Sequence, residues 1–282
     1  MSNNNNKILQ ATDNLVSGES FSIYWDPDRQ RGFTAVEHLG SLDDYYESLD
    51  YISHNPNPNS LISQLYLLAR VFMLTFKYLL LKKHLIPKSQ LLDIGCGTGS
   101  FLAFMKKKGF KVTGIESNLK ARTICLKRNL DVRLNDAGLP HESFDTICLW
   151  HVLEHLPKPE ICIEAYKDLL KPEGLLVVAV PNFASHDSIH YQQDWAALDV
   201  PRHLWHFTPK GMISMVEVLG FKLIKKRPLW LDVFYICYLS EKHRKKTFPL
   251  LRGLFKGSFF SFRSFFSAKH SSLVFVFKKQ AL

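Results

Sequence analysis

The most constraining feature of the chain is the segment from Leu91 to Ser100, which reads LLDIGCGTGS. An apolar run ends at Asp93, and three glycines follow at alternate positions, Gly95, Gly97 and Gly99, before a helical pattern begins. This order predicts a strand, a tight turn and a helix N-terminus, which together bring backbone N–H groups against a nucleotide-like ligand. The spacing differs from the G-x-G-x-x-G of dinucleotide folds, and the Lys-Ser or Lys-Thr pair of a phosphate-binding loop is missing. The turn therefore favours an adenosine that carries no phosphate.

Downstream of this turn, apolar strand patterns alternate with helical patterns. Such alternation predicts an α/β fold in which parallel strands are joined by right-handed crossovers. We expect Lys171–Gly174 to end one helix, and we expect another helix to begin at Thr208 and Pro209 and to end at Gly220. The expected strands span residues 90–94, 111–115, 131–134, 144–150, 175–180, 221–226 and 272–277, and the other expected helices span 100–108, 118–129 and 159–170.

Because ligands of such sheets bind at the carboxyl ends of the strands, the residues at those ends are candidates for a site. Glu116 follows the second strand, where an acid can accept hydrogen bonds from both ribose hydroxyls. Asp136 and Ala137 follow the third strand, where a carboxylate can bind the adenine amine. Trp150 and His151 end the fourth strand and would face the reactive end of the ligand. The predicted cofactor-binding residues are Asp93, Gly95, Cys96, Gly97, Gly99, Glu116, Asp136, Ala137 and Trp150.

Residues 91–99, Glu116, Asp136 and residues 144–157 together resemble the motifs of class I S-adenosylmethionine-dependent methyltransferases, most closely the group of ubiquinone-biosynthesis O-methyltransferases. The resemblance covers about residues 90–225, with 272–277 as the last strand. It implies a Rossmann-like α/β fold with a seven-stranded sheet in the order 3-2-1-4-5-7-6, whose last strand is antiparallel and whose two faces carry helices. It also implies S-adenosyl-L-methionine as the cofactor and methyl transfer to a small-molecule or lipid-like acceptor through an O- or C-nucleophile.

The first 60 residues resemble bacterial members of that group in the stretches 44–48 and 50–54, but those relatives carry a cysteine-rich zinc knuckle upstream. Here no cysteine precedes Cys96, so we expect residues 1–60 to form an irregular cap without zinc. Residues 61–86 are apolar but contain Arg70 and Lys77, which would each cost about 2.5–3.5 kcal/mol within a membrane. An amphipathic helix packed on the next domain is therefore favoured, and an interfacial helix is the alternative.

The methyltransferase domain is expected over residues 87–282, with two insertions. The polar segment 182–207 is rich in His and Trp and is expected to form a lid over the site. The second insertion, 230–270, combines many phenylalanines with Arg252, Lys256 and Arg263. Apolar and basic groups together fit a surface helix that touches lipid, and a helix packed on the sheet edge or on a partner subunit is the alternative.

His151 and His203 are the candidate catalytic residues. The sulfonium methyl of the implied cofactor is already activated, so the enzyme must position the acceptor and, for some nucleophiles, supply a base. Glu154 and His155 are expected to be structural. The letters His151-x-x-Glu154-His155 also spell a zinc-peptidase signature, but the first histidine lies at a strand end and not within a helix. In relatives of the resembled group a Glu-x-x-Glu-His motif can hold a divalent metal; His151 replaces its first residue, and we predict no metal.

Composition indicates the cellular compartment in which the protein is expected. The net charge is +10, and the five cysteines include no C-x-x-C pair, which indicates reduced thiols in the cytoplasm. The N-terminal Asn run has no apolar core, so no secretory signal is expected. The basic runs favour solvated faces or contact with an anionic membrane. We therefore expect a cytoplasmic protein, with a peripheral contact at the inner membrane surface as an option.

Three other functions are weighed against methyl transfer to a small molecule. Neither an Asn/Asp-Pro-Pro-aromatic segment nor a Pro-Cys pair follows the fourth strand, so no nucleic-acid partner is expected. The glycine spacing disfavours an NAD-dependent oxidoreductase. A non-catalytic protein that keeps the fold for a membrane or a protein partner is the alternative from another class. The sequence leaves the oligomeric state and the identity of the acceptor open.

Overall fold

The computed structural model describes residues 6–36, Tyr45 and residues 61–280, and it describes the side chains of the first helix from residue 68 onward. Apart from Tyr45, the stretches 44–48 and 50–54 lie outside the described residues.

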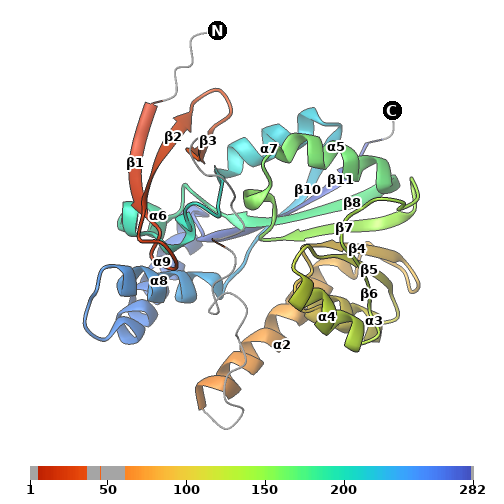
Figure 1. The fold of residues 1–282 in the computed structure, drawn as a ribbon, viewed down its shortest axis with the longest axis horizontal. Coiled ribbons are helices and arrows are strands. Elements are labelled where there is room, and N and C mark those ends of the chain that lie inside the picture. Colours follow the sequence, from red (N-terminus) through yellow and green to blue (C-terminus); the bar gives the residue numbers. More distant parts are fainter. Residues whose placement is uncertain (1–5, 37–44, 46–60, 281–282) are drawn as a thin grey trace.

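A seven-stranded sheet forms the centre of the molecule (Figure 1). Its order is β10-β11-β8-β7-β4-β5-β6, and β11 runs antiparallel to both β8 and β10 while the other pairs are parallel. Renumbered along the chain, this order is the predicted 3-2-1-4-5-7-6, so the predicted fold class is confirmed. The strands are β4 (Gln90–Ile94), β5 (Lys111–Ile115), β6 (Asp131–Arg133), β7 (Phe144–Trp150), β8 (Leu170–Pro181), β10 (Phe221–Pro228) and β11 (Ser272–Lys279).

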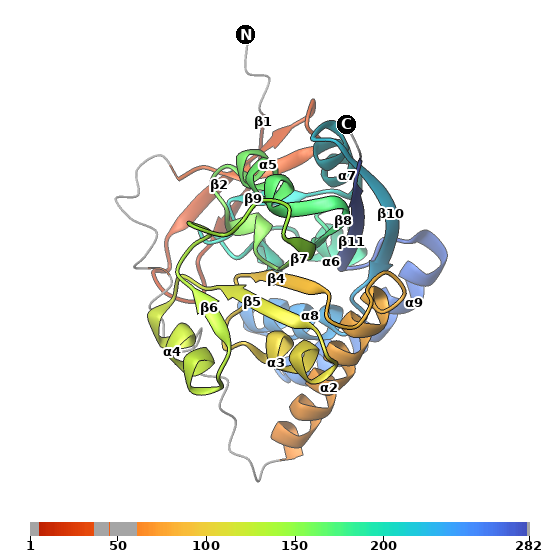
Figure 2. The same ribbon diagram turned by 90° about the vertical axis from the view of Figure 1, so that its right-hand side faces the viewer.

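Helices cover both faces of this sheet (Figures 1 and 2). On one face α5 (Pro159–Leu169) and α7 (Pro209–Val218) pack on the apolar cluster around Ile147 and Phe275. On the other face α3 (Ser100–Lys107) and α4 (Leu119–Lys127) lie together with α2 (Leu61–Leu81). The end of α2 enters the second core, where Leu80 and Leu81 are buried with Phe101. The helix therefore packs on the sheet domain, but it ends at Leu81 and not at the expected residue 86.

Most element boundaries follow from local chemistry. Thr208 accepts a hydrogen bond from the Gly211 N–H at 3.1 Å and caps α7, as predicted. One boundary was predicted wrongly, because Lys171–Gly174 belongs to β8 and does not form a turn after α5. Leu170 pairs with Phe144 of β7, and the register shifts before Thr146 pairs with Leu175. Lys171–Gly174 therefore lies in β8 as a bulge without a partner on β7, and Glu173 within it has a φ of +64°.

The prediction that residues 1–60 are irregular is wrong for their described part. The strands β1 (Asn6–Thr12), β2 (Ser20–Asp26) and β3 (Arg31–Thr34) form an antiparallel sheet that β9 (Trp205–Phe207), from the segment 182–207, completes. Ile23 on the inner face is fully buried against a cluster that includes Tyr191 and Trp195. The partner of β3 is β9, which lies more than 160 residues further along the chain, and local sequence patterns do not reveal a pairing over that distance.

Both insertions contain helices. The segment 182–207 contains α6 (His186–Tyr191), the 3₁₀ turns η3 (Gln192–Asp194) and η4 (Ala196–Leu198), and β9. The segment 230–270 forms an antiparallel helix pair, α8 (Asp232–His243) and α9 (Pro249–Ser267), whose helices pack on each other. Within the described part of the chain, none of the helices has the length and apolar character that crossing a bilayer requires.

Candidate functional site

The glycine turn follows β4 and leads into α3. Gly95, Gly97 and Gly99 have φ values of +64°, +55° and +75°, which side chains rarely adopt. A Cβ at Gly95 would lie 2.5 Å from Val152 Cγ2, and one at Gly99 would lie 2.5 Å from Leu130 Cδ1. A Cβ at Gly97 would have no heavy atom within 4 Å. Close packing thus requires two of the glycines, and the third leaves open space beside the backbone of the turn.

Glu116 is brought directly to this turn, as the sequence predicted. It follows β5 and is only 9% exposed. One carboxylate oxygen accepts a hydrogen bond from the Gly97 N–H at 2.7 Å, and the other accepts one from the Asn118 N–H at 2.8 Å. Each oxygen retains a second lone pair that can accept a ligand hydroxyl. The carboxylate therefore holds the turn in place and can still receive a ribose.

Two buried polar atoms beside the turn lack a hydrogen-bond partner within the described part of the chain: Asp93 Oδ1 and Trp150 Nε1. Asp93 is 2% exposed, and this burial raises its pKa to about 7 although the Lys77 charge opposes the shift. Buried polar groups are almost always paired, so unpaired ones beside an open turn indicate a place for a polar ligand. These residues fit an adenosine-type ligand that carries hydroxyl and amino groups.

The remaining predicted cofactor residues differ in their burial and hydrogen bonding. The Cys96 N–H donates to Ile115 O at 3.0 Å, and burial raises the pKa of the Cys96 thiol, so this residue acts through its backbone. Asp136 and Ala137 are exposed on the loop after β6, where the Ala137 N–H donates to Asn135 Oδ1 at 3.1 Å. The structure thus places Cys96 at the turn and leaves Asp136 and Ala137, the pair predicted to bind adenine, on an exposed loop.

Lys77 of α2 is a residue of the site that the sequence did not indicate. Its Nζ lies 4.1 Å from the centre of the Trp150 ring and 5.5 Å from that of Phe101, within the range of cation–π contacts. Burial lowers the pKa of Lys77, while the charges of Asp93 and Asp232 act in the opposite direction. In the sequence this residue merely interrupts an apolar pattern, and only the packing of α2 brings it to the site.

His151 is held between two carboxylates at the end of β7. Its Nε2 lies 3.0 Å from Asp232 Oδ2, and its Nδ1 lies 3.3 Å from Glu154 Oε1. Burial alone would lower the pKa of His151, but the hydrogen bonds to Asp232 and Glu154 raise it to about 10. Both ring nitrogens then carry protons at neutral pH. This arrangement provides a cation rather than the proton acceptor that the sequence suggested.

Asp232, the first residue of α8, was missed by the sequence analysis. It lies 81 positions after His151, inside an insertion whose only clear signal was its aromatic and basic composition. No local motif could identify it, because the packing of α8 on the strand ends creates its contact with His151.

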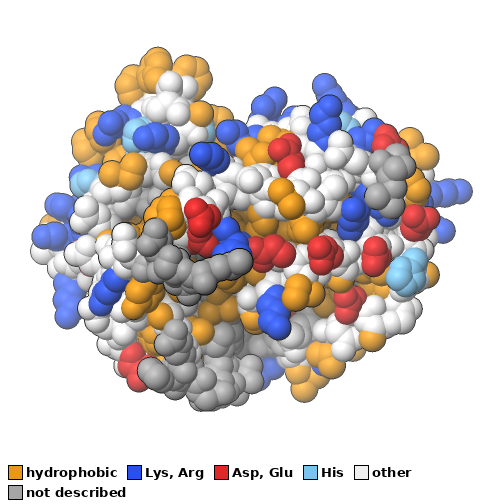
Figure 3. Space-filling view, turned by 90° about the horizontal axis from the view of Figure 1, so that it is seen from above, with side chains coloured by type: hydrophobic (Ala, Val, Ile, Leu, Met, Phe, Trp, Pro, Cys, Tyr) orange, Lys and Arg blue, Asp and Glu red, His pale blue; other side chains and the backbone are white. Residues whose placement is uncertain are grey.

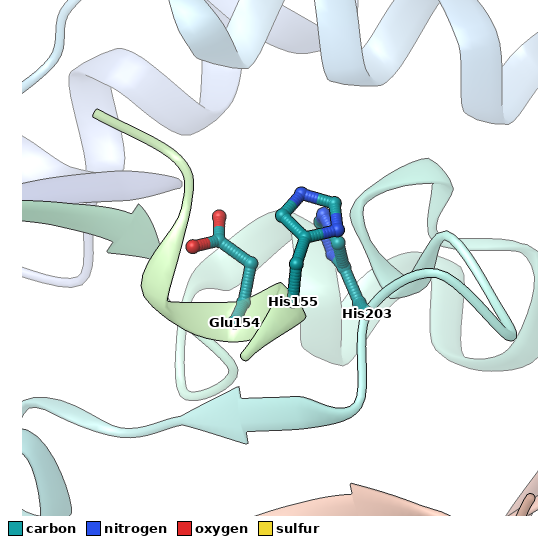
Figure 4. A group of neighbouring side chains, drawn as sticks. All are labelled: Glu154, His155 and His203. Atoms are coloured by element: carbon teal, nitrogen blue, oxygen red, sulfur yellow. The ribbon is translucent and has the colours of Figure 1, made fainter. Parts of the chain in front are cut away.

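A second cluster combines Glu154, His155 and His203 (Figure 4). Glu154 and His155 come from the 3₁₀ turn η2 (Leu153–His155), and His203 comes from the loop that leads to β9. One potential ligand atom from each side chain lies within 4.8 Å of the others. These are ligand types that bind divalent transition metals, and within the described residues this is the group with suitable geometry.

Backbone carbonyls orient both imidazole rings of this cluster. His155 Nδ1 lies 3.0 Å from Arg202 O, and His203 Nδ1 lies 2.8 Å from Ala197 O, so in both rings Nδ1 is the nitrogen that donates to a carbonyl. Burial lowers the pKa of His155 to about 4. The Nε2 atom of His203 is left without a carbonyl partner and lies near Glu154. Of the two predicted catalytic histidines, His203 is the one whose geometry suits a base.

Comparisons with known proteins agree with this geometry. A family model described as "Methyltransferase domain" matches residues 66–226. A ubiquinone biosynthesis O-methyltransferase of Haemophilus ducreyi is 32% identical over 107 residues, which are 33% of this chain and 45% of that protein. The chain therefore spans about half the length of the curated relatives that it first matches. The protein of the same name from Rickettsia typhi is 25% identical over 183 residues, or 55% of this chain and 74% of that one.

Among solved structures, phosphoethanolamine N-methyltransferase 2 of Haemonchus contortus, in complex with S-adenosyl-L-methionine, is similar to this chain with a TM-score of 0.55 and 15% sequence identity. The superposition covers 89% of this chain and 62% of that one. At this identity the likeness concerns the fold, which both chains share.

Proposed function

The chain belongs to the methyltransferase-domain family, and on this premise we propose that it transfers a methyl group from S-adenosyl-L-methionine to an acceptor held beneath the lid. The family match covers more than half of the chain and confirms the resemblance that the motifs predicted. The observation that carries the proposal is the turn at Gly97, whose N–H is fixed by Glu116 and whose open side is flanked by the unpaired polar atoms of Asp93 and Trp150.

Each part of the donor has an assigned group in this proposal. Glu116 accepts hydrogen bonds from the ribose hydroxyls, and the loop at Asp136 and Ala137 receives the adenine. The backbone of the glycine turn and Asp93 hold the amino-acid end, with Trp150 beside the reactive centre. When bound, the cofactor supplies a methyl group that its sulfonium has already activated. The residues of the chain then need to bind it, exclude water and hold the acceptor in line.

The acceptor that we propose is a small or lipid-like molecule with an oxygen or carbon nucleophile. A cationic His151 suits a hydroxyl acceptor, because a positive charge nearby lowers the pKa of the hydroxyl and favours the oxyanion that attacks the methyl group. The Nε2 lone pair of His203 can take the proton of a hydroxyl acceptor. The named activity of the Haemophilus relative, an O-methyltransferase, supports the same class of acceptor.

We propose that this reaction needs no metal, because the methyl group is activated by its leaving group. Removal of divalent ions with EDTA should therefore leave turnover unchanged. The cluster of Glu154, His155 and His203 provides the critical test of this proposal, and a stoichiometric metal in the purified protein together with EDTA-sensitive turnover would contradict it.

We place the protein in the cytoplasm, in peripheral contact with the inner membrane surface. The five cysteines are all free thiols, which supports a reducing compartment. The aromatic and basic insertion supports the membrane contact.

Calorimetry with S-adenosylmethionine and with its demethylated product tests the proposal. Both should bind to the wild-type protein, and Glu116→Ala should weaken binding by about 1–3 kcal/mol, the cost of leaving buried polar groups unpaired. Glu164→Ala, which removes an exposed carboxylate from α5, is the matched control and should bind normally. Absence of binding by the wild-type protein would refute the proposal. Binding without labelling of any acceptor in a cell extract would favour the non-catalytic alternative.

A further inference from the structure

Helix α9 packs on the molecule with its small residues. The buried positions of the helix are Gly253, Gly257, Phe260 and Ser264. A Cβ at Gly253 would lie 2.6 Å from Tyr238 Cα, and one at Gly257 would lie 2.6 Å from Phe234 Cδ1. The two glycines therefore let the backbone of α9 approach α8 closely, and the inner face of α9 contributes only one large apolar side chain to the core.

The outward face of α9 carries the large apolar side chains. Residues spaced by three or four positions share one face of a helix, and five such residues here are between 47% and 74% exposed. A helix on the surface of a globular protein normally has the reverse arrangement, with its apolar stripe toward the core. The stripe consists of Leu251, Phe255, Phe259, Phe262 and Phe266.

The surroundings of this stripe are mainly basic, although Arg252 is paired with the buried Glu241 of α8. Between Lys242 and Lys269 the sequence has eight Lys or Arg residues and no Asp or Glu. Arg252 and Arg263 lie along the helix, and Arg263 is placed over the Phe259 ring at 5.8 Å. In the view from above, acidic side chains lie among basic ones across the middle of the molecule (Figure 3). The hydrophobic side chains at the upper left, on the side of α8 and α9, are bordered by Lys, Arg and His (Figure 3).

The basic charge around the apolar stripe distinguishes between the two surfaces that could bury it, a second copy of the chain and a lipid bilayer. In a two-fold dimer the patch would face itself, and the basic residues of both copies would be brought together without acidic partners. The surface of an anionic bilayer offers both an apolar layer and negative headgroups, and each basic residue near it adds to the attraction. We propose that the outward face of α9, with its basic border, docks the protein on an anionic lipid bilayer.

Helix α8 connects the outward face of α9 to the acceptor side of the site. The packing partner of α9 is α8, and the first residue of α8 is Asp232, which binds His151. Docking would therefore hold the acceptor side near the membrane surface, where a lipid-like acceptor resides. This last step rests on the proposed function, whereas the docking itself does not.

Sedimentation of the full-length protein with vesicles tests the docking. The wild-type protein should bind vesicles of phosphatidylglycerol and phosphatidylcholine and bind vesicles of phosphatidylcholine alone at least tenfold more weakly. The triple variant Phe255→Ser, Phe262→Ser, Phe266→Ser should lose at least a hundredfold in affinity, since each buried Phe contributes about tenfold. Lys245→Gln with Lys246→Gln should cost about fivefold for each charge removed.

A matched control removes exposed apolar residues elsewhere. Ile161 and Val218, which are 57% and 83% exposed, lie on α5 and α7 on the opposite face of the sheet, and Ile161→Ser with Val218→Ser should bind vesicles as the wild type does. Equal binding by the triple variant, equal binding to neutral vesicles, or a dimer that the triple variant dissociates would each overturn the docking. Binding of S-adenosylmethionine, measured on the same samples, reports separately on folding and on the proposed function.

Discussion

The two sides of the site are assembled in different ways. The proposed donor side lies mostly within residues 93–137, a single stretch in which strands, turns and helix caps follow one another, and Trp150 is its one member from outside that stretch. The acceptor side combines Lys77, His151, His203 and Asp232 from four separate segments. Backbone conformation therefore dominates on the donor side, whereas the charge states of the acceptor side depend on packing between distant segments. Substitutions on the two sides should differ accordingly.

The largest effect is expected on the donor side, at Gly99. Gly99→Ala places a Cβ in the left-handed region at φ +75° and within 2.9 Å of Cys125 Sγ and 2.5 Å of Leu130 Cδ1. The backbone conformation costs about 1–2 kcal/mol and the overpacking about 1–3 kcal/mol more. Urea unfolding should show a loss of stability equal to the sum of these two contributions, and calorimetry should show that S-adenosylmethionine no longer binds.

Gly109→Ala is the control for this substitution. Gly109 also has a positive φ, +87°, but a Cβ at this position would have no heavy atom within 4 Å. The variant should lose only the backbone contribution of about 1–2 kcal/mol and should bind the donor normally. Equal destabilisation in the two variants would mean that the packing at Gly99 is not required.

On the acceptor side, Asp232→Asn should lower the rate of methyl transfer by about a hundredfold while donor affinity is retained, since a charge-stabilising group is weakened. With Asp232 present, the raised pKa keeps His151 protonated up to about pH 10. Without it, only Glu154 opposes the effect of burial, so the pKa of His151 falls and the activity of the variant should decline at a lower pH than that of the wild type. A pH–rate profile of both proteins measures this difference.

Asp194→Asn removes a carboxylate that pairs with Arg244 at 2.9 Å in the same part of the molecule, and it should leave the pH–rate profile unchanged. If Asp232→Asn shows the profile of the wild type, His151 does not act as a cation.

Substitution of Lys77 tests whether a charge on the acceptor side affects binding of the methyl donor. S-adenosylmethionine carries a positive sulfonium and its demethylated product does not, so a nearby ammonium should disfavour the first ligand relative to the second. Lys77→Met should shift the ratio of the two affinities toward S-adenosylmethionine by about fivefold, or roughly 1 kcal/mol. Calorimetry with both ligands measures the ratio.

Lys108→Met is the matched control, because Lys108 makes a similar contact with Tyr78 at 5.3 Å outside the site. If Lys77→Met leaves the ratio of the two affinities unchanged, the charge of Lys77 does not influence the bound donor.

The junction between the segment 182–207 and the N-terminal sheet makes the stability of the protein depend on pH. His206 Nε2 lies 2.9 Å from Thr34 Oγ1, and burial lowers the pKa of His206 to about 3. The unfolded chain then binds the additional proton between about pH 6.5 and pH 3, so this contribution to the free energy of unfolding is complete above pH 6.5 and decreases as the pH falls. The loss should be about 1 kcal/mol per pH unit below pH 6.

Urea unfolding at pH 7 and at pH 5 should show a smaller decrease for His206→Gln than for the wild type. A parallel pH dependence of the two proteins would contradict the assignment of a neutral, buried His206.

The sequence analysis succeeded where chemistry is local. The glycine turn and the approach of Glu116 followed from short patterns, since each strand, cap and turn is determined by its own residues, whereas the strand order was implied by the family resemblance. It failed where pairing is distant. β3 pairs with β9 more than 160 residues away, and Lys171–Gly174 forms a bulge of β8 between two residues, Leu170 and Leu175, that pair with β7. His151 was identified as a site residue, but its protonation depends on Asp232 and could not be predicted.

The sequence by itself determined the donor side, because the positive φ angles of the three glycines and the acid after the next strand are encoded within a few residues of where they act. Only the tertiary structure decided the acceptor side. Burial and ion pairing set the charges of Lys77 and His151, and both arise from helices that the chain brings back across the strand ends. The same holds for α9, whose composition showed aromatic and basic residues but whose packing decided that the aromatic face points outward.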